Sequence, residues 1–414
     1  MTQLIERHLA DKDTLMQLDE AQARIAAAHD VRAGVETVAL SDAIGRVLAI
    51  DTLAPIDLPN ADNSAVDGFA VRFDDLLQDE LTVLPLHGRT IAGISAEVLL
   101  PEGCAGRIFT GAVLPGGSDT VLMQEDCDVV ESCVCLPPGI HRGDNRRAAG
   151  EDIARDELAL AAGRRLMPPD LALLAALGFD RIAVRKRLRV AIFSTGNELA
   201  TPPAPLRRGQ VYDANRFLLG GLLRQLQVDL TDGGILPDDP AATRAALRAA
   251  AADVDLVITS GGVSCGEEDH VRAAIEAIGQ LEFWRVAIKP GRPVALGMLG
   301  GTPLLGLPGN PVAALVTFWA IGRPLLDRLA GAAPTATLRL PVRARFHHRK
   351  KAGLREYLRV LIAPDGTAYC HPKKGTGMLT SLTSSDALLE LTEHVTSIAP
   401  GDIAPCIPLQ LLYS

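Results

Sequence analysis

Acidic side chains stand in three short polar segments of this 414-residue chain, one of them rich in glycine. The segments and their carboxylates are STGNEL at 194–199 with Glu198, LPDDP at 236–240 with Asp238 and Asp239, and TSGGVSCGEED at 259–269 with Asp269. Carboxylate oxygens are ligands that Mg²⁺ prefers, and glycine-rich turns expose backbone N–H groups to phosphate oxygens. The combination predicts a site that holds a phosphate-bearing ligand together with Mg²⁺.

A fourth segment, GLPGNP at 306–311, ends in Asn310 and Pro311, which are favoured at the first positions of a helix. The free N–H groups and the dipole of a helix start favour a bound oxyanion. None of the four segments matches the P-loop or the dinucleotide-binding fingerprint. The residues that we expect to bind the ligand from these loops are Ser194, Thr195, Gly196, Ser260, Gly261, Gly262, Ser264, Pro308, Gly309, Asn310 and Pro311.

The carboxylates also have ordinary structural interpretations. Asp239 precedes Pro240 and suits the N-cap of the next helix, which leaves Asp238 as a free carboxylate or a turn residue. Asp269 either caps the helix that follows it or binds a metal. Glu198 has no capping role that the sequence explains, so the functional interpretation is strongest there.

A second polar cluster lies in LPNADNSAVDGFAVRF at 58–73. Asn63, Ser64 and Asp67 form a polar turn that leads into a strand, and Asx-turn chemistry alone accounts for such a pattern. Thr110 begins another loop that contains several glycines. From the residues alone, these positions are either turn formers or parts of a site.

Basic residues gather in Val342–Arg359, which holds seven Lys or Arg and one Glu, a local charge of 7 − 1 = +6. The whole chain has 41 Lys or Arg and 50 Asp or Glu, so its net charge is 41 − 50 = −9. The segment is either a solvated β face or an anion site shared with Lys289 and Arg292 of the KPGRP turn. Nucleic acid is disfavoured, because the molecule is acidic and offers few stacking aromatics.

The acidic loops alternate with strands and helices between residues 188 and 330. Strand-like runs such as VAIFS and VDLVITSGG are followed by helical runs such as PAATRAALRAAAAD. This alternation is typical of a parallel sheet with helices on both faces. Ligands of such sheets bind beyond the carboxyl ends of the strands. We therefore expect the four loops to meet at one edge of the sheet.

Short β-like runs flank this region on both sides. The expected fold class is α/β plus β, with a central three-layer α/β domain, a small β domain inserted in an N-terminal α+β region, and a C-terminal β domain. In the N-terminal region we expect helices at 14–30 and directly after Ser41. The expected boundaries are 1–50 with 150–186 for the N-terminal linking and dimerisation region, 51–149 for the inserted β domain, 187–331 for the α/β domain, and 332–414 for the C-terminal β domain.

Composition excludes several classes of protein. With 48% apolar and 22% charged residues the chain is not intrinsically disordered. The N-terminus has mixed charge and no apolar core, so no signal peptide is expected. The uncharged stretch Pro293–Gly322 is interrupted by prolines and glycines, which disfavours a membrane span. Seven cysteines without a CxxC pair indicate free thiols and a cytoplasmic protein.

The chain resembles the MoeA family, molybdopterin molybdenumtransferase, whose eukaryotic relative is the gephyrin E domain. The resemblance covers nearly the whole chain. It rests on nine motifs in order: NSAVDGFAVR, TGAVLPGGSDTVLMQED, RRAAGEDI, STGNEL, YDANR, ILPDDP, TSGGVSCGEEDH, WRVAIKPGRPVALG and GLPGNPVAALVTF.

The resemblance implies a reaction in which adenylylated molybdopterin and molybdate yield molybdenum cofactor and AMP, with Mg²⁺. It implies a homodimer whose site lies between the α/β domain of one subunit and the NSAVDG domain of the other. Its partners would be small-molecule substrates, with the adenylyltransferase and molybdoenzyme maturation factors as protein partners. The implied residues are Asp67 and Thr110 across the interface, Glu198, Asp238 and Asp269 for metal and substrate, Lys289 for a substrate anion, Pro308 and Pro311 for loop shape, and Ser381 with Arg355 or Arg359 for molybdate.

Two other functions stay open at this point. A paralogue that uses tungstate or a modified pterin would share these motifs. A non-catalytic scaffold related to gephyrin would not need the carboxylates Asp67, Glu198 and Asp269, so their presence favours an enzyme.

Overall fold

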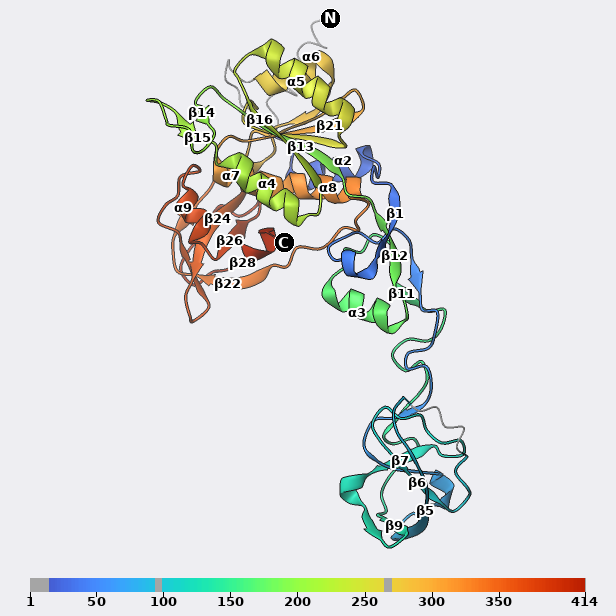
Figure 1. Ribbon diagram of the computed structural model, residues 1–414. Coiled ribbons are helices and arrows are strands. Elements are labelled where there is room, and N and C mark those ends of the chain that lie inside the picture. The colour runs from blue at the N-terminus through green and yellow to red at the C-terminus, as the bar shows by residue number, and fades with distance from the viewer. Residues whose placement is uncertain (1–14, 94–98, 264–269, 414) are drawn as a thin grey trace, which may run out of the picture.

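The computed structural model describes residues 15–93, 99–263 and 270–413. The molecule is elongated, with a β domain set apart from a larger body (Figure 1). The body contains the α/β domain and a C-terminal β domain, and a linking region joins it to the separate β domain. The expectation of a mixed α/β and β architecture is confirmed.

The linking region is built from segments far apart in sequence. Helix α2 (Leu18–Ala28) packs Leu18, Ala21 and Ile25 into the core of the body. Strand β1 (Val35–Ala39) pairs antiparallel with β12 (Arg181–Arg185), and β2 (Thr52–Leu53) pairs with β11 (Leu158–Leu160). Helix α3 (Pro168–Ala176) begins at the expected proline pair.

The prediction of a helix directly after Ser41 is wrong. Only a single 3₁₀ turn, η1 (Leu40–Asp42), forms there. Beyond it the chain is extended, because the N–H of Leu48 bonds to the carbonyl of Arg164 and that of Ala49 to the carbonyl of Ala183. These partners come from distant sequence, so tertiary pairing overrides the local helical pattern. The helix expected at 14–30 is shorter and begins at Leu18.

The separate β domain holds a six-stranded sheet in the order β7-β4-β6-β5-β9-β8. Its strands are β4 (Gly68–Val71), β5 (Thr82–Thr90), β6 (Ala105–Ile108), β7 (Thr120–Met123), β8 (Asp128–Val130) and β9 (Cys133–Leu136). A short pair, β3 (Asn63–Ser64) with β10 (Arg146–Arg147), lies beside it. Two 3₁₀ turns, η2 (Phe73–Asp75) and η3 (Gln124–Asp126), follow β4 and β7.

The α/β domain has a six-stranded sheet in the order β16-β13-β17-β21-β20-β18. The first four strands run parallel, and two antiparallel strands complete one edge. The strands are β13 (Arg189–Thr195), β16 (Asp229–Leu236), β17 (Leu256–Ser260), β18 (Gln280–Trp284), β20 (Ala295–Leu299) and β21 (Thr302–Leu307).

Helices cover both faces of this sheet, as expected. On one face lie α4 (Asn215–Gln225), α7 (Pro311–Thr317), the π-helical turn η4 (Phe318–Gly322) and α8 (Arg323–Ala330). On the other lie α5 (Pro240–Asp253) and α6 (His270–Ile278). Alternation along β13 explains the two cores: Val190 and Ile192 pack on the α4 side, and Ala191 and Phe193 pack on the α5 side.

The C-terminal β domain closes on itself. Strands β24, β25, β22, β28 and β26 pair in that order, and β26 pairs back to β24, which leaves no open edge among them. The strands are β22 (Leu340–Ala344), β24 (Arg355–Ile362), β25 (Thr367–Cys370), β26 (Ala387–Leu391) and β28 (Ile403–Pro408). A short strand from the α/β side, β19 (Ile288–Lys289), adds to β24 and joins the two domains.

Minor elements complete the chain: β23 (His348–Arg349) with β27 (Ser397–Ile398), α9 (Leu379–Thr383) and α10 (Gln410–Tyr413). Among the described residues, no helix has the length and apolar character needed to cross a membrane. The uncharged stretch Pro293–Gly322 folds as β20, β21, α7 and η4.

Candidate active site

A cleft of about 740 Å³ lies at the carboxyl ends of β13, β17 and β21. The loops expected to meet there do line it. The expected residues in its wall are Ser194, Thr195, Gly196, Glu198, Asp238, Ser260, Gly261, Gly262, Pro308, Gly309, Asn310 and Pro311. Ser264 and Asp269 lie outside the described residues, so the structure does not place them.

Two of the expected carboxylates come together in this cleft. Glu198 follows β13 and Asp238 follows its neighbour β16, so both stand at the same edge of the sheet. The backbone N–H of Asn197 donates to Asp238 Oδ2 at 2.9 Å, and Asn197 Oδ1 accepts from the N–H of Asp238 at 3.2 Å. These reciprocal bonds fix the two loops against each other.

The structure separates the two neighbouring aspartates by role. Asp239 Oδ1 accepts the backbone N–H of Ala242 at 2.6 Å and is the N-cap of α5, which confirms the capping interpretation. Asp238 is left facing the cleft. Hard cations favour oxygen ligands, so Glu198 and Asp238 fit Mg²⁺ chemically. Within the described part of the chain no third His, Cys, Asp or Glu joins them as a ready metal group.

The TSGG loop approaches the β13 loop too closely for any side chain. Gly261 and Gly262 have φ of +97° and +69°. A Cβ on Gly261 would lie 2.6 Å from Thr195 Oγ1, and one on Gly262 would lie 2.8 Å from a methyl group of Val271. Glycine is therefore required here both by conformation and by space.

Sequence reasoning missed Asn215, the first residue of α4. Its Nδ2 donates to Ser260 Oγ at 2.8 Å and to the carbonyl of Gly309 at 2.7 Å, which ties the loops after β17 and β21 together. Its Oδ1 and the hydroxyl of Ser194 are buried and have no hydrogen-bond partner. The signal in the sequence was the YDANR motif, in which Asn215 follows Asp213 by two positions. Tyr212 and Asp213 also line the cleft unexpectedly.

A second, smaller pocket of about 150 Å³ lies where β19 meets the C-terminal domain. Lys289, Arg359, Lys373 and Lys374 line it, with Glu356 as a carboxylate. Glu356 is almost fully buried, and its Oε1 lies 2.8 Å from Lys289 Nζ while its Oε2 lies 3.1 Å from His348 Nε2. The pocket therefore carries an excess of positive charge.

The pocket distinguishes the two candidate arginines. Arg359 is buried, lines the pocket and donates to Ser381 Oγ and to the carbonyls of Lys374 and Gly375. Arg355 instead binds Asp19 at 3.0 Å and Glu393 at 2.8 Å and does not line the pocket. Arg292, the other expected anion contact, is exposed and lines neither cavity.

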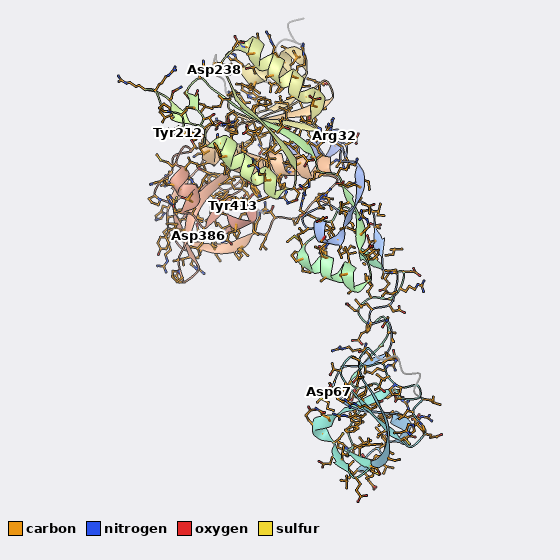
Figure 2. All side chains as sticks on the ribbon, viewed as in Figure 1. Arg32, Asp67, Tyr212, Asp238, Asp386 and Tyr413 are labelled. Carbon is orange, nitrogen blue, oxygen red and sulfur yellow. The ribbon has the colours of Figure 1, made fainter. Side chains whose placement is uncertain are left out.

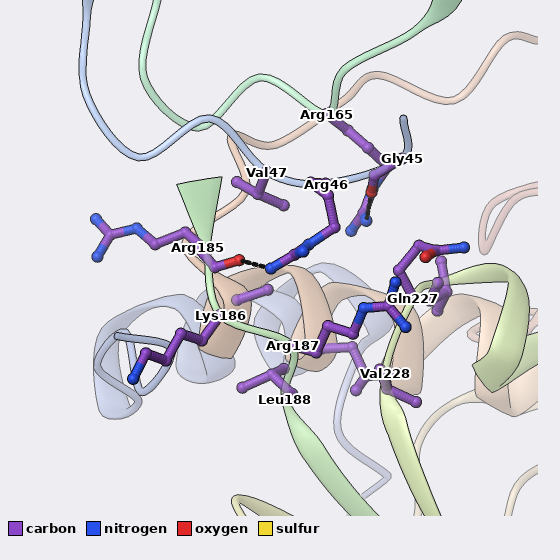
Figure 3. Close-up of a pocket in the computed structure, with 13 residues that line it drawn as sticks. Gly45, Arg46, Val47, Arg165, Arg185, Lys186, Arg187, Leu188, Gln227 and Val228 are labelled. Carbon is purple, nitrogen blue, oxygen red and sulfur yellow. Dashed lines mark hydrogen bonds between the residues drawn. The ribbon is translucent and has the colours of Figure 1, made fainter. Parts of the chain in front are cut away.

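Asp67 and Thr110 lie in the separate β domain, at the opposite end of the molecule from Asp238 (Figure 2). Asp67 Oδ1 accepts the backbone N–H of Thr110 at 2.8 Å and its hydroxyl at 2.7 Å. These bonds hold the pKa of Asp67 below its ordinary value, and the backbone hydrogen bond has the larger effect. Within one chain this carboxylate does not reach the cleft.

Comparisons with known proteins agree with this arrangement. The family model described as MoeA N-terminal region (domain I and II) matches residues 16–178, a probable molybdopterin binding domain matches 191–328, and MoeA C-terminal region (domain IV) matches 341–409. The chain is 42% identical over 318 residues to a molybdopterin molybdenumtransferase of Haemophilus influenzae, covering 77% of this chain and 78% of that protein.

Further relatives cover more of the chain. Molybdopterin molybdenumtransferase 2 of Mycobacterium tuberculosis is 35% identical over 385 residues, with 88% of this chain and 93% of that protein covered. A crystal structure of a molybdopterin biosynthesis MoeA protein from Pyrococcus horikoshii superposes with a TM-score of 0.76 at 30% identity, covering 96% of this chain and 99% of that one. A second from the same organism gives a TM-score of 0.82 at 27% identity, covering 95% and 100%.

Proposed function

This chain belongs to the molybdopterin molybdenumtransferase (MoeA) family, and from that premise we propose that it inserts molybdate into adenylylated molybdopterin with Mg²⁺-dependent release of AMP. It is thus an enzyme of molybdenum cofactor biosynthesis. The observation that carries the proposal is the cleft in which Glu198 and Asp238 face the glycine-rich loops after β17 and β21.

Different residues of the cleft would bind the metal ion and the phosphates of the substrate. Glu198 and Asp238 would hold Mg²⁺, and we propose Asp269, which lies outside the described residues, as a further ligand. When bound, the ion would neutralise charge on the phosphate oxygens of the substrate. Backbone N–H groups of the TSGG loop and of the start of α7, such as that of Gly262, would bind phosphate oxygens directly. The N–H of Gly261, in contrast, already bonds to the carbonyl of Leu307, and that of Val312 to the carbonyl of Thr376. Asn215 would hold these two loops at a fixed spacing.

Release of AMP breaks one P–O bond of the pyrophosphate and adds an oxygen of water or molybdate to the phosphorus. The protein must therefore meet two requirements: it must bind the pyrophosphate anhydride, and it must bind molybdate close to it. The basic pocket beside Lys289 supports the second requirement, because Arg359 and Lys289 supply positive charge and Ser381 Oγ lies against the Arg359 guanidinium. We propose Arg359 rather than Arg355 as the molybdate contact, since Arg355 is already bound to carboxylates.

The position of Asp67 supports a homodimeric site. Its carboxylate lies far from the cleft of its own chain (Figure 2), and hydrogen bonds from Thr110 hold its pKa below the ordinary value. We propose that Asp67 and Thr110 of one subunit complete the cleft of the other. Mixing Asp67→Asn with Glu198→Gln chains tests this, because each mixed dimer would carry one intact site and one doubly altered site.

The expected result of mixing is recovery of about a quarter of wild-type AMP release, since half of the dimers are mixed and half of their sites are intact. Each variant alone should be nearly inactive, and size-exclusion chromatography should show a dimer. If the mixture stays inactive although mixed dimers form, Asp67 does not act across an interface.

The activity itself is tested by measuring AMP release from adenylylated molybdopterin with Mg²⁺ and either molybdate or tungstate. Release that depends on molybdate and is lost in Glu198→Gln would support the insertase. Release with tungstate alone would indicate a tungstate-using paralogue. A folded protein that binds the pterin but releases no AMP with either oxyanion would indicate a scaffold.

A further inference from the structure

Tyr212 is a large, exposed aromatic residue in the wall of the cleft. The residue is 43% exposed, and it lines the cleft beside Val211 and Asp213. Among the described residues it is the one aromatic side chain in the wall of the cleft. The other described residues of this wall are polar, aliphatic or glycine, so none of them offers a second aromatic face.

The backbone that carries Tyr212 is held on both sides. Strands β14 (Leu199–Ala200) and β15 (Val211–Tyr212) pair in parallel, with Tyr212 opposite Ala200. The N–H of Val211 donates to the carbonyl of Glu198 at 2.9 Å, so the tyrosine follows a residue tied directly to a proposed metal ligand. The backbone that carries the ring thus runs next to Glu198, a residue of the part of the cleft that would hold the pyrophosphate.

Asp213, the residue after Tyr212, fixes the end of β15 through its side chain. Asp213 is 2% exposed, and its carboxylate binds Arg216 Nε at 3.1 Å. Arg216 also binds Asp232 of β16 at 2.9 Å and Thr201 Oγ1 at 3.1 Å. The exposed ring therefore projects from a fixed backbone, which lowers the entropy that a ligand must overcome to stack on it.

We propose that Tyr212 is a substrate-binding residue that stacks on a planar heteroaromatic ring of the substrate. This inference rests on the proposed function, because adenylylated molybdopterin carries two such rings, the pterin and the adenine. Aromatic side chains stack on heterocycles of this kind without needing matched hydrogen bonds. The surrounding carboxylates and N–H groups would bind the phosphates, and Tyr212 would bind the ring attached to them.

The test is steady-state AMP release by Tyr212→Ala, Tyr212→Phe and wild type. Loss of the stack should raise KM for adenylylated molybdopterin about ten- to a hundredfold and leave kcat within about twofold. Tyr212→Phe should restore the wild-type KM, because the ring face is kept. Phe217→Ala is the matched control: Phe217 is 60% exposed on α4 but does not line the cleft, so its loss should leave KM unchanged.

Inhibition experiments identify which ring of the substrate stacks on Tyr212. AMP and a molybdenum-free pterin are each added as inhibitors of wild type and Tyr212→Ala, and the one whose inhibition constant rises in the variant carries the stacked ring. The proposed stacking would be overturned by an unchanged KM in Tyr212→Ala. It would also be overturned if KM rose in Tyr212→Ala and stayed raised in Tyr212→Phe. Absence of AMP release by wild type would instead count against the proposed function. Calorimetric binding of AMP and of the molybdenum-free pterin to wild type and Tyr212→Ala would then test the stacking by itself, and equal affinities for both compounds would overturn it.

Discussion

One oxygen of Asp67 accepts two hydrogen bonds from the same residue, the backbone N–H of Thr110 at 2.8 Å and its hydroxyl at 2.7 Å. Both donors favour the ionised carboxylate, so the pKa of Asp67 lies below its ordinary value. The two residues are separated by 42 intervening positions and meet because β4 pairs with β6. The pair is therefore a product of the sheet and presents a fixed negative charge on the separate β domain.

The first prediction concerns this pair. Thr110→Val removes the hydroxyl donor and keeps the backbone donor, so the pKa of Asp67 should rise towards its ordinary value. A catalytic carboxylate that must be ionised is active above its pKa, so the acid limb of the AMP-release profile should move to higher pH. Thr110→Ser, which keeps the hydroxyl, should leave the profile unchanged. Identical acid limbs in Thr110→Val and wild type would show that Asp67 does not control the reaction.

The second prediction separates Asp238 from Asp239. Asp239→Ala removes an N-cap and should destabilise the α/β domain by about 1 kcal/mol, lowering its Tm by roughly 2–4 °C, with AMP release retained. Asp238→Asn should abolish Mg²⁺-dependent release with a smaller change in Tm, because the amide oxygen can still accept the N–H of Asn197 while the charge that would bind the metal is lost. Calorimetry and activity measured on both variants give the answer. The reverse pattern would assign the metal to Asp239.

A third prediction concerns the basic pocket. Arg359→Ala should weaken molybdate binding by tenfold or more, because it removes a buried guanidinium and frees Ser381. Arg355→Ala should leave molybdate affinity within about twofold but lower Tm, since it leaves Asp19 and Glu393 without their cation. Equilibrium dialysis with molybdate tests both. Equal losses of affinity in the two variants would contradict the assignment of Arg359.

The fourth prediction is a pH dependence of stability. Partial burial raises the pKa of Asp255, but hydrogen bonds from the side chain and backbone of Arg189 outweigh it and hold the pKa below its ordinary value. A depressed pKa stabilises the fold above the ordinary carboxyl value of about 3.9, and this contribution is lost as the pH falls through the folded-state value. Asp255→Asn should therefore lower Tm at pH 7.

The difference in Tm between Asp255→Asn and wild type should shrink below about pH 4, where the wild-type carboxyl takes up its proton. Arg189→Ala should produce a similar loss at pH 7, and the double variant should add little to either, because both remove the same pair. Additive losses would show that the two residues stabilise the fold independently.

The sequence by itself determined the elements that carry the α/β chemistry. Alternating strands and helices over 188–330 placed four polar loops at one edge, and the structure puts Glu198, Asp238, Gly261 and Pro308 in one cleft there. The N-cap at Asp239 was also readable, because it depends on an aspartate directly before a proline. Such features follow from residue type and short spacing, which local physics decides.

Tertiary structure decided what spacing could not. The segment after Ser41 has a helical pattern but pairs in extended form with residues near 164 and 183. Arg355 and Arg359 are four positions apart on one strand, yet only Arg359 reaches the basic pocket. Asn215 joins two loops whose partners lie 45 and 94 positions further along the chain. Each outcome depends on contacts between distant segments, and the free energy of such contacts appears only once the sheets and helices have packed.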